Sequence, residues 1–111
     1  MLYSGPVAAE EVFGPVVVLA RIATDTDGFD AVNDSQYGLQ AGVFTRRLDR
    51  AFEAHARLDV GGVIVGDVPS YRADQMPYGG AKGSGIGREG LASAMADYTE
   101  ERVMVLTGLQ L

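Results

Sequence analysis

In the first half of the chain, a continuous run of apolar residues is followed by apolar residues at the spacing of a helix. Residues 16–23 are nearly all apolar and rich in β-branched side chains, which predicts a strand covered on both faces. Residues 24–27 then offer several N-cap side chains. They predict a short helix with Phe29 and Val32 on one face, ending near residues 33–34.

The next segments continue the alternation of strand and helix. Residues 40–45 predict a second strand, residues 48–58 the clearest helix, and residues 63–65 a third strand. The apolar stripe expected on that helix consists of Leu48, Ala51, Phe52, His55 and Leu58. This order predicts an α/β fold with a βαβαβ arrangement and right-handed crossovers.

The second half of the chain is dominated by a long connection, residues 66–89. Loops of this length inside a compact domain are usually functional or belong to a larger structure. A final helix is expected over residues 89–100, and residues 102–106 are expected to form a β-like segment. The apolar face of that helix consists of Leu91, Ala94, Met95 and Tyr98.

Composition and charge narrow the class of protein. With 47% hydrophobic residues, the 111-residue chain is typical of one small globular domain, which should bury roughly 60–70% of its unfolded surface. The net charge of −6 and nine scattered Lys and Arg residues exclude a nucleic-acid binder. No apolar stretch approaches the ~20 residues of a membrane span, and no signal peptide is apparent. We therefore expect a cytoplasmic protein without a membrane partner.

The chain contains no cysteine and one histidine. A disulfide framework, a thiolate metal site and a thiol nucleophile are thus excluded, as is a zinc site built from histidine pairs. We expect no metal site and no catalytic residue. His55 lies on the expected helix stripe, which favours a packed or helix-edge histidine over a catalytic base.

The glycine-rich residues 79–90 resemble two nucleotide-binding motifs superficially. Lys82 is followed by glycine rather than Ser or Thr, which excludes a P-loop. Residues 85–90 satisfy G-x-G-x-x-G, but they follow a Pro-containing loop instead of a strand, and no acidic residue follows about 20 residues later. Tight packing of the backbone against another segment is the favoured interpretation.

Several motifs in order carry a stronger signal than any one alone. They are EEVFGPV (10–16), NDSQYGL (33–39), AGVFT (41–45), MPYGGAK (76–82), SGIGREG (84–90) and YTE (98–100). In this order and spacing they resemble the C-terminal part of the aldehyde dehydrogenase superfamily, from residue 10 to about residue 106. Residues 67–72 are similar to a subgroup acting on small hydroxylated or phosphorylated aldehydes.

The resemblance implies an organisation for the chain. Residues 1–9 would be an atypical leader, residues 10–101 the C-terminal part of the catalytic domain, and residues 102–111 an oligomerisation strand and tail. The C-terminal strand would join a sheet shared between subunits, so a homo-oligomer is expected, and full-length dehydrogenase subunits are possible partners. Gly66 stands where the family usually has asparagine, so this loop could be anchored differently.

The resemblance also implies two cofactor-binding residues. Glu11 would accept hydrogen bonds from the nicotinamide-side ribose, since a carboxylate can accept from both hydroxyls. Phe13 would pack near the nicotinamide ring. From residue type alone, a solvated glutamate and a core phenylalanine would be the simpler interpretation.

Two further residues are candidates for contact with substrate. Tyr78 matches an aromatic wall of the family's aldehyde tunnel, with a turn tyrosine after Pro77 as the alternative. Arg72 could pair with an anionic or hydroxylated substrate group, since guanidinium forks fit carboxylate and phosphate. A surface arginine without such a role is the competing interpretation.

The chemistry of the family requires groups that the chain lacks. A thiolate attacks the aldehyde, hydride passes to NAD or NADP, and a glutamate activates the water that hydrolyses the thioester. We therefore expect a truncated segment that is inactive and binds no cofactor alone, with NAD or NADP bound in the intact parent. A non-catalytic oligomerisation module is the alternative, and a stand-alone nucleotide binder is weaker because two side chains hold only one edge of a cofactor.

Overall fold

The structure, a computed structural model, describes residues 5–110. Residues 1–4 of the expected leader and Leu111 of the expected tail lie outside this range. In chain order the elements are α1 (Pro6–Ala9), α2 (Asp25–Asn33), β1 (Tyr37–Gly38), β2 (Gln40–Val43), α3 (Leu48–Arg57), β3 (Gly62–Val65), β4 (Ala81–Lys82) and α4 (Leu91–Asp97).

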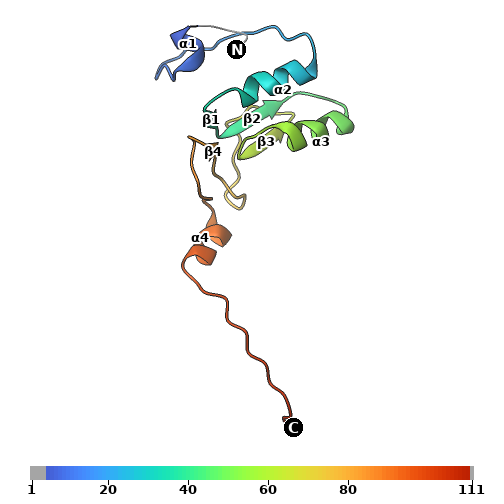
Figure 1. The fold of residues 1–111 in the computed structure, drawn as a ribbon, viewed down its shortest axis with the longest axis vertical. Coiled ribbons are helices and arrows are strands. Elements are labelled where there is room, and N and C mark those ends of the chain that lie inside the picture. Colours follow the sequence, from blue (N-terminus) through green and yellow to red (C-terminus); the bar gives the residue numbers. More distant parts are fainter. Residues whose placement is uncertain (1–4, 111) are drawn as a thin grey trace.

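The centre of the molecule is a βαβ unit (Figure 1). Strands β2 and β3 are parallel, with Gln40 opposite Gly62 and Val43 opposite Val65, and α3 connects them. Among residues 5–110 the buried hydrophobic side chains are Phe29 of α2, Ala54 of α3 and Leu58. Partly buried side chains pack around these three, namely Ala41, Val43, Val60 and Val63. The core is therefore small and shared by both helices and the two strands.

Helix α2 starts at a capping box, which selects Thr24 among the N-cap side chains that the sequence offers. Thr24 accepts a hydrogen bond from the Asp27 backbone N–H, while the Asp27 carboxylate accepts one from the Thr24 backbone N–H. These two bonds satisfy donors that the first helical turn leaves without partners. Asn33 fixes the other end, because its amide donates to the Arg57 carbonyl at 2.7 Å and accepts from the Asp59 N–H at 2.8 Å.

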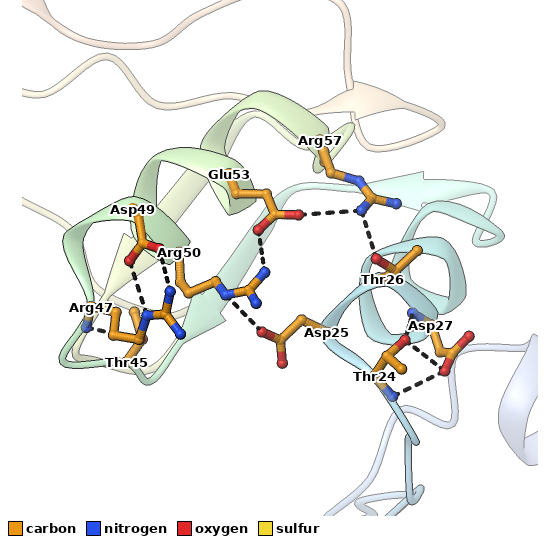
Figure 2. Close-up of polar contacts among 10 residues, drawn as sticks. All are labelled: Thr24, Asp25, Thr26, Asp27, Thr45, Arg47, Asp49, Arg50, Glu53 and Arg57. Carbon is orange, nitrogen blue, oxygen red and sulfur yellow. Dashed lines mark hydrogen bonds and ion pairs between the residues drawn. The ribbon is translucent and has the colours of Figure 1, made fainter.

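Charged side chains join α2 to α3 along the edge of the core (Figure 2). Arg57 lies 3.2 Å from the Asp30 carboxylate, donates to the Thr26 hydroxyl at 2.9 Å, and covers the Phe29 ring at 5.1 Å. Its aliphatic stem and guanidinium thereby cover an apolar ring that would otherwise face water.

Glu53 lies between two of the arginines on α3. It pairs with Arg50 and, at 3.5 Å, with Arg57, and Arg50 in turn approaches Asp25 of α2 at 3.4 Å. The hydrogen bond from Arg50 is the main cause that lowers the pKa of the Glu53 carboxyl below its ordinary value. The same group therefore stabilises the helix pair only while it is ionised.

A second two-stranded sheet attaches the glycine-rich segment to this unit. β1 and β4 are antiparallel, with Tyr37 opposite Lys82 and Gly38 opposite Ala81. Lys82 has a left-handed backbone (φ 53°), and its ammonium group donates to the carbonyls of Asn33 and Ser35 at the end of α2. The segment is thus held by backbone pairing and by a cation at a helix C-terminus.

Glycines allow unusually close backbone contact at this junction. A Cβ atom added to Gly61 would lie 1.7 Å from the Gly79 carbonyl oxygen, and one added to Gly80 would lie 2.5 Å from the Ser84 Cβ. No side chain can occupy such a position without moving the backbone. Tight packing against another segment is therefore confirmed for Gly79 and Gly80, which lie against Gly61, but at Gly87 an added Cβ would meet nothing within 4 Å.

Two predicted strands are absent from the described part of the chain. Residues 16–23 and 102–106 are exposed, and neither segment belongs to a strand of the described structure. The predicted first strand of the βαβαβ unit and the predicted β-like C-terminal segment are therefore not confirmed. A strand forms when its backbone N–H and C=O groups pair with a neighbouring strand. The βαβ unit offers these two segments no such strand.

The buried face of α3 also differs from the expected stripe. Ala54 and Leu58 are buried, but Leu48, Phe52 and His55 are exposed. The helix turns its Arg50–Glu53–Arg57 side toward α2, so ion pairs and short side chains face the partner helix. The final helix is shorter than expected, and its face of Leu91, Met95 and Tyr98 is exposed.

Folding leaves much of the surface uncovered. The accessible surface is 9295 Å², against about 17,000 Å² for an unfolded chain of this mass, so roughly 45% is buried. The expected 60–70% is therefore not reached. The molecule measures 71 × 33 × 23 Å. Two segments, called the arms below, lie outside the βαβ unit: residues 5–23 run beside it at one end of the molecule, and residues 98–110 extend far away from it (Figure 1). Across residues 5–110 there is no helix with the length and apolar character needed to cross a membrane.

We predict that Glu53→Gln destabilises the chain at neutral pH and that the difference from wild type shrinks in acid. The pKa of Glu53 is lowered by folding, so its contribution is complete above its ordinary pKa of 4.5 and disappears as the pH falls through the folded value. Urea unfolding followed by circular dichroism at a series of pH values measures this. Glu100→Gln, in the C-terminal segment, serves as the control with the same charge change; an equal loss in both variants would contradict the prediction.

Candidate functional site

Two distant parts of the long connection meet as a backbone pair. The Tyr78 N–H donates to the Glu89 carbonyl at 3.0 Å, and the Glu89 N–H donates back to the Tyr78 carbonyl. This isolated antiparallel bridge places the side chains of the two residues near one another. Gly90 follows with a φ of 121°, which favours glycine and lets the chain turn into α4.

Arg72 completes a cluster with these two residues, which we call the Arg72–Tyr78–Glu89 cluster. Its guanidinium carbon lies 4.5 Å from the centre of the Tyr78 ring, and its Nη2 lies 3.3 Å from Glu89 Oε2. The ring attracts the cation, while the carboxylate neutralises its charge. The side chains of Arg72 and Glu89 are 48% and 69% exposed, so a ligand in solution can reach both.

The loop that carries Arg72 is anchored to the sheet by one side chain. The amide of Gln40, on β2, donates to the carbonyls of Pro69 and Tyr71 at 2.6 and 3.1 Å. Gly66, at the start of the loop, has a φ of 86° and donates to the Val43 carbonyl. Glycine and asparagine tolerate this conformation best, so the glycine here maintains the turn.

The two expected cofactor residues lie elsewhere, on the arm before α2. Phe13 is 89% exposed and has a left-handed backbone with a φ of 52°. Glu11 is exposed and lines an open hollow together with Ser35, Tyr37 and Ser84. The structure thus brings Arg72 and Tyr78 together, and it places Glu11 and Phe13 on a different segment.

Two residues of this site, Glu89 and Gln40, were not expected from the sequence. Glu89 was seen only as part of the glycine-rich motif, and Gln40 only as the start of a strand. No local pattern connects Arg72 with a carboxylate 17 positions later, because the contact depends on the Tyr78–Glu89 backbone pair. Within residues 5–110, no group of acidic and histidine side chains could hold a metal ion.

Comparison with known proteins identifies the relationship. The model of the aldehyde dehydrogenase family matches residues 4–104. The chain belongs to the aldehyde dehydrogenase family. A 3-sulfolactaldehyde dehydrogenase of Priestia megaterium is 50% identical over 100 residues, which is 90% of this chain and 21% of that protein. A lactaldehyde dehydrogenase of Methanococcus vannielii is 40% identical over 96 residues, covering 86% of this chain and 21% of that protein.

Solved structures of the family share the fold of this aldehyde dehydrogenase segment. Aldehyde dehydrogenase 21 of Physcomitrella patens, in complex with its product succinate, superposes with a TM-score of 0.80 at 47% identity, over 83% of this chain and 19% of that one. The NADP complex of a glyceraldehyde-3-phosphate dehydrogenase of Bacillus halodurans gives a TM-score of 0.81 at 39% identity, over 90% and 21%. The chain spans about one fifth of the length of the relatives it matches.

We predict that Gln40→Ala loosens the loop that presents Arg72. It removes two hydrogen bonds, which together contribute on the order of 1 kcal/mol net, and so raises the population of the open loop about five-fold. Limited digestion with trypsin, which cleaves after Arg72, should proceed faster by about that factor. Gln75→Ala, in the same loop, should leave the rate unchanged; equal rates in the wild type and Gln40→Ala would show that Gln40 is not the anchor.

Proposed function

We propose that this chain supplies the C-terminal part of an aldehyde dehydrogenase catalytic unit, which oxidises an aldehyde to a carboxylic acid with NAD or NADP. The family match over residues 4–104 is the observation that carries the proposal. The 111 residues contain no cysteine, so the thiol that forms the covalent intermediate comes from polypeptide outside them. By itself the chain is not expected to turn over aldehyde.

The uncovered surface supports a role inside a larger unit. A self-sufficient domain of this mass exposes about 5,900 Å², some 3,400 Å² less than this chain does. That excess is larger than the roughly 800 Å² that one partner buries in a standard interface. Exposed apolar side chains on both arms, such as Val17, Leu19 and Val103, are suited to burial against additional polypeptide.

Glu11 and Phe13 are the residues proposed to meet the cofactor. The Glu11 carboxylate is exposed and can accept hydrogen bonds from a ribose diol, and the exposed Phe13 ring offers a flat apolar surface. Bound NAD or NADP would accept the hydride that leaves the substrate. Since these two groups contact one edge of a dinucleotide, no binding to the isolated chain is expected.

Arg72 and Tyr78 are the residues proposed to meet the substrate. Their stacked arrangement presents a cation beside an aromatic wall, which suits a short aldehyde with an anionic or hydroxylated tail. Related proteins are named for 3-sulfolactaldehyde and lactaldehyde, and one solved relative holds succinate. A sulfonate or second carboxylate on the substrate would be a natural ligand of the Arg72 guanidinium.

Association through the C-terminal segment is a second proposed role. Residues 102–106 are extended, and Val103, Met104, Val105 and Leu106 are 68–91% exposed. An apolar extended segment with free backbone groups is prone to pair with a strand of another chain. The partner would be a second copy of this chain or a full-length dehydrogenase subunit.

Complementation tests the catalytic proposal. The chain is mixed with a relative, such as the Priestia 3-sulfolactaldehyde dehydrogenase, from which the matching segment has been removed. We expect aldehyde-dependent reduction of NAD or NADP in the mixture and none with either part alone. Glu11→Gln should raise the KM for the cofactor about ten-fold, corresponding to one lost charge-assisted bond. Turnover by the isolated chain, free of host enzyme, would refute the proposal.

Light scattering tests the association. We expect the wild-type chain to form dimers or larger species as its concentration rises, because residues 102–106 of one copy pair with another chain. Val105→Lys places a charge in that pairing segment and should shift the mass toward the monomer. Val68→Lys, a matched change in an exposed loop position, is the control. A wild-type monomer at high concentration would contradict the proposal.

A further inference from the structure

We propose that Glu89 is a specificity-determining residue that competes with anionic substrates for Arg72. In this arrangement the carboxylate occupies the cation until an incoming sulfonate, phosphate or carboxylate group displaces it. The identity of that group as the tail of an aldehyde rests on the function proposed above. The competition itself rests on contacts within the chain.

The first of these contacts keeps Glu89 in place. Its backbone both donates to and accepts from Tyr78, so the Glu89 Cα cannot move away from the cluster when the ion pair opens. Only the side chain is free to rotate. The negative charge therefore remains close to any anion that binds Arg72.

The second contact leaves most of the guanidinium available. Glu89 reaches Arg72 through one pair of atoms, Oε2 and Nη2, at 3.3 Å. A guanidinium carries five N–H donors on three nitrogens in a planar fork, and Glu89 engages only one of these nitrogens, Nη2. A ligand with two or three oxygens on one centre can form two parallel bonds where Glu89 forms one.

The exposure of the pair makes the exchange feasible. Arg72 and Glu89 are both about half or more exposed, and ion pairs of this kind are weak, so displacing the carboxylate requires little energy. A neutral substrate tail gains nothing from displacing the Glu89 carboxylate, because the displacement would leave the charges of Arg72 and Glu89 unpaired. The cluster should thus favour anions that outcompete a single carboxylate contact, and it should bind them less tightly than an unopposed arginine would.

The experiment follows the Arg72 Nε–Hε resonance of the ¹⁵N-labelled 111-residue chain during titration with methanesulfonate and with inorganic phosphate. Arg72→Ala assigns the resonance, and dimethyl sulfone serves as a neutral probe of similar size. We expect weak saturable binding of both anions to the wild type. Glu89→Gln removes one negative charge about 5 Å from the bound anion and should tighten binding roughly three- to ten-fold. The neutral probe should cause no shift in either protein.

Two controls separate this proposal from structural effects and from the proposed function. Glu101→Gln makes the same charge change in the C-terminal segment and should leave the anion affinity unchanged. Amide spectra of each variant show whether the fold is retained. Equal affinity in the wild type and Glu89→Gln, or no anion binding in either, would overturn the proposal. Neither result depends on whether complementation restores dehydrogenase activity.

Discussion

The contact between Gly61 and the backbone of residues 79–80 is the constraint on which the position of the site depends. At this point two chain segments approach so closely that a Cβ would overlap a carbonyl oxygen. This contact joins the turn between α3 and β3 to the segment that leads into β4. It thereby fixes the position of Tyr78, whose backbone pairs with Glu89. Arg72 can stack on Tyr78 only because this segment is held in place.

Arginine side chains make similar contacts in two regions of the molecule, one at the core and one on a loop. Around the small core, the arginines of α3 bridge to acidic residues of α2, so the helix pair is held by charged contacts at its edge. In the Arg72–Tyr78–Glu89 cluster, a similar combination of arginine, ring and carboxylate is exposed instead. Arg57 and Arg72 both cover an aromatic ring, but the ring under Arg57 is buried in the core, whereas Arg72 stands on a loop and is about half exposed.

The sequence was most informative where local signals agree. An N-cap within residues 24–27, the helices after it and the strands β2 and β3 were all predicted within a few residues, and the family motifs identified the aldehyde dehydrogenase relationship. The strands predicted at residues 16–23 and 102–106 are not confirmed, because an apolar run becomes a strand only when a partner strand is available. Periodicity also misplaced the buried face of α3, since the ion pairs to α2 rotate Phe52 and His55 toward solvent.

The site was predicted less completely than the fold. Arg72 and Tyr78 were singled out from residue type and resemblance, and the structure brings them together, but their role in binding stays a prediction. Glu89 was missed because its contact with Arg72 arises from non-local backbone pairing. Glu11 and Phe13 were identified by motif alone, and both are exposed on a segment apart from the Arg72–Tyr78–Glu89 cluster.

The compactness of the βαβ unit has a consequence for how the molecule assembles. β2, α3 and β3 follow one another within 26 residues, so their contacts close short loops and should form rapidly. The two apolar arms contribute nothing to this nucleus. Burial of the arms against the additional polypeptide proposed above would be a separate, slower step, and before it the arms would be the part of the chain most accessible to proteases and chaperones.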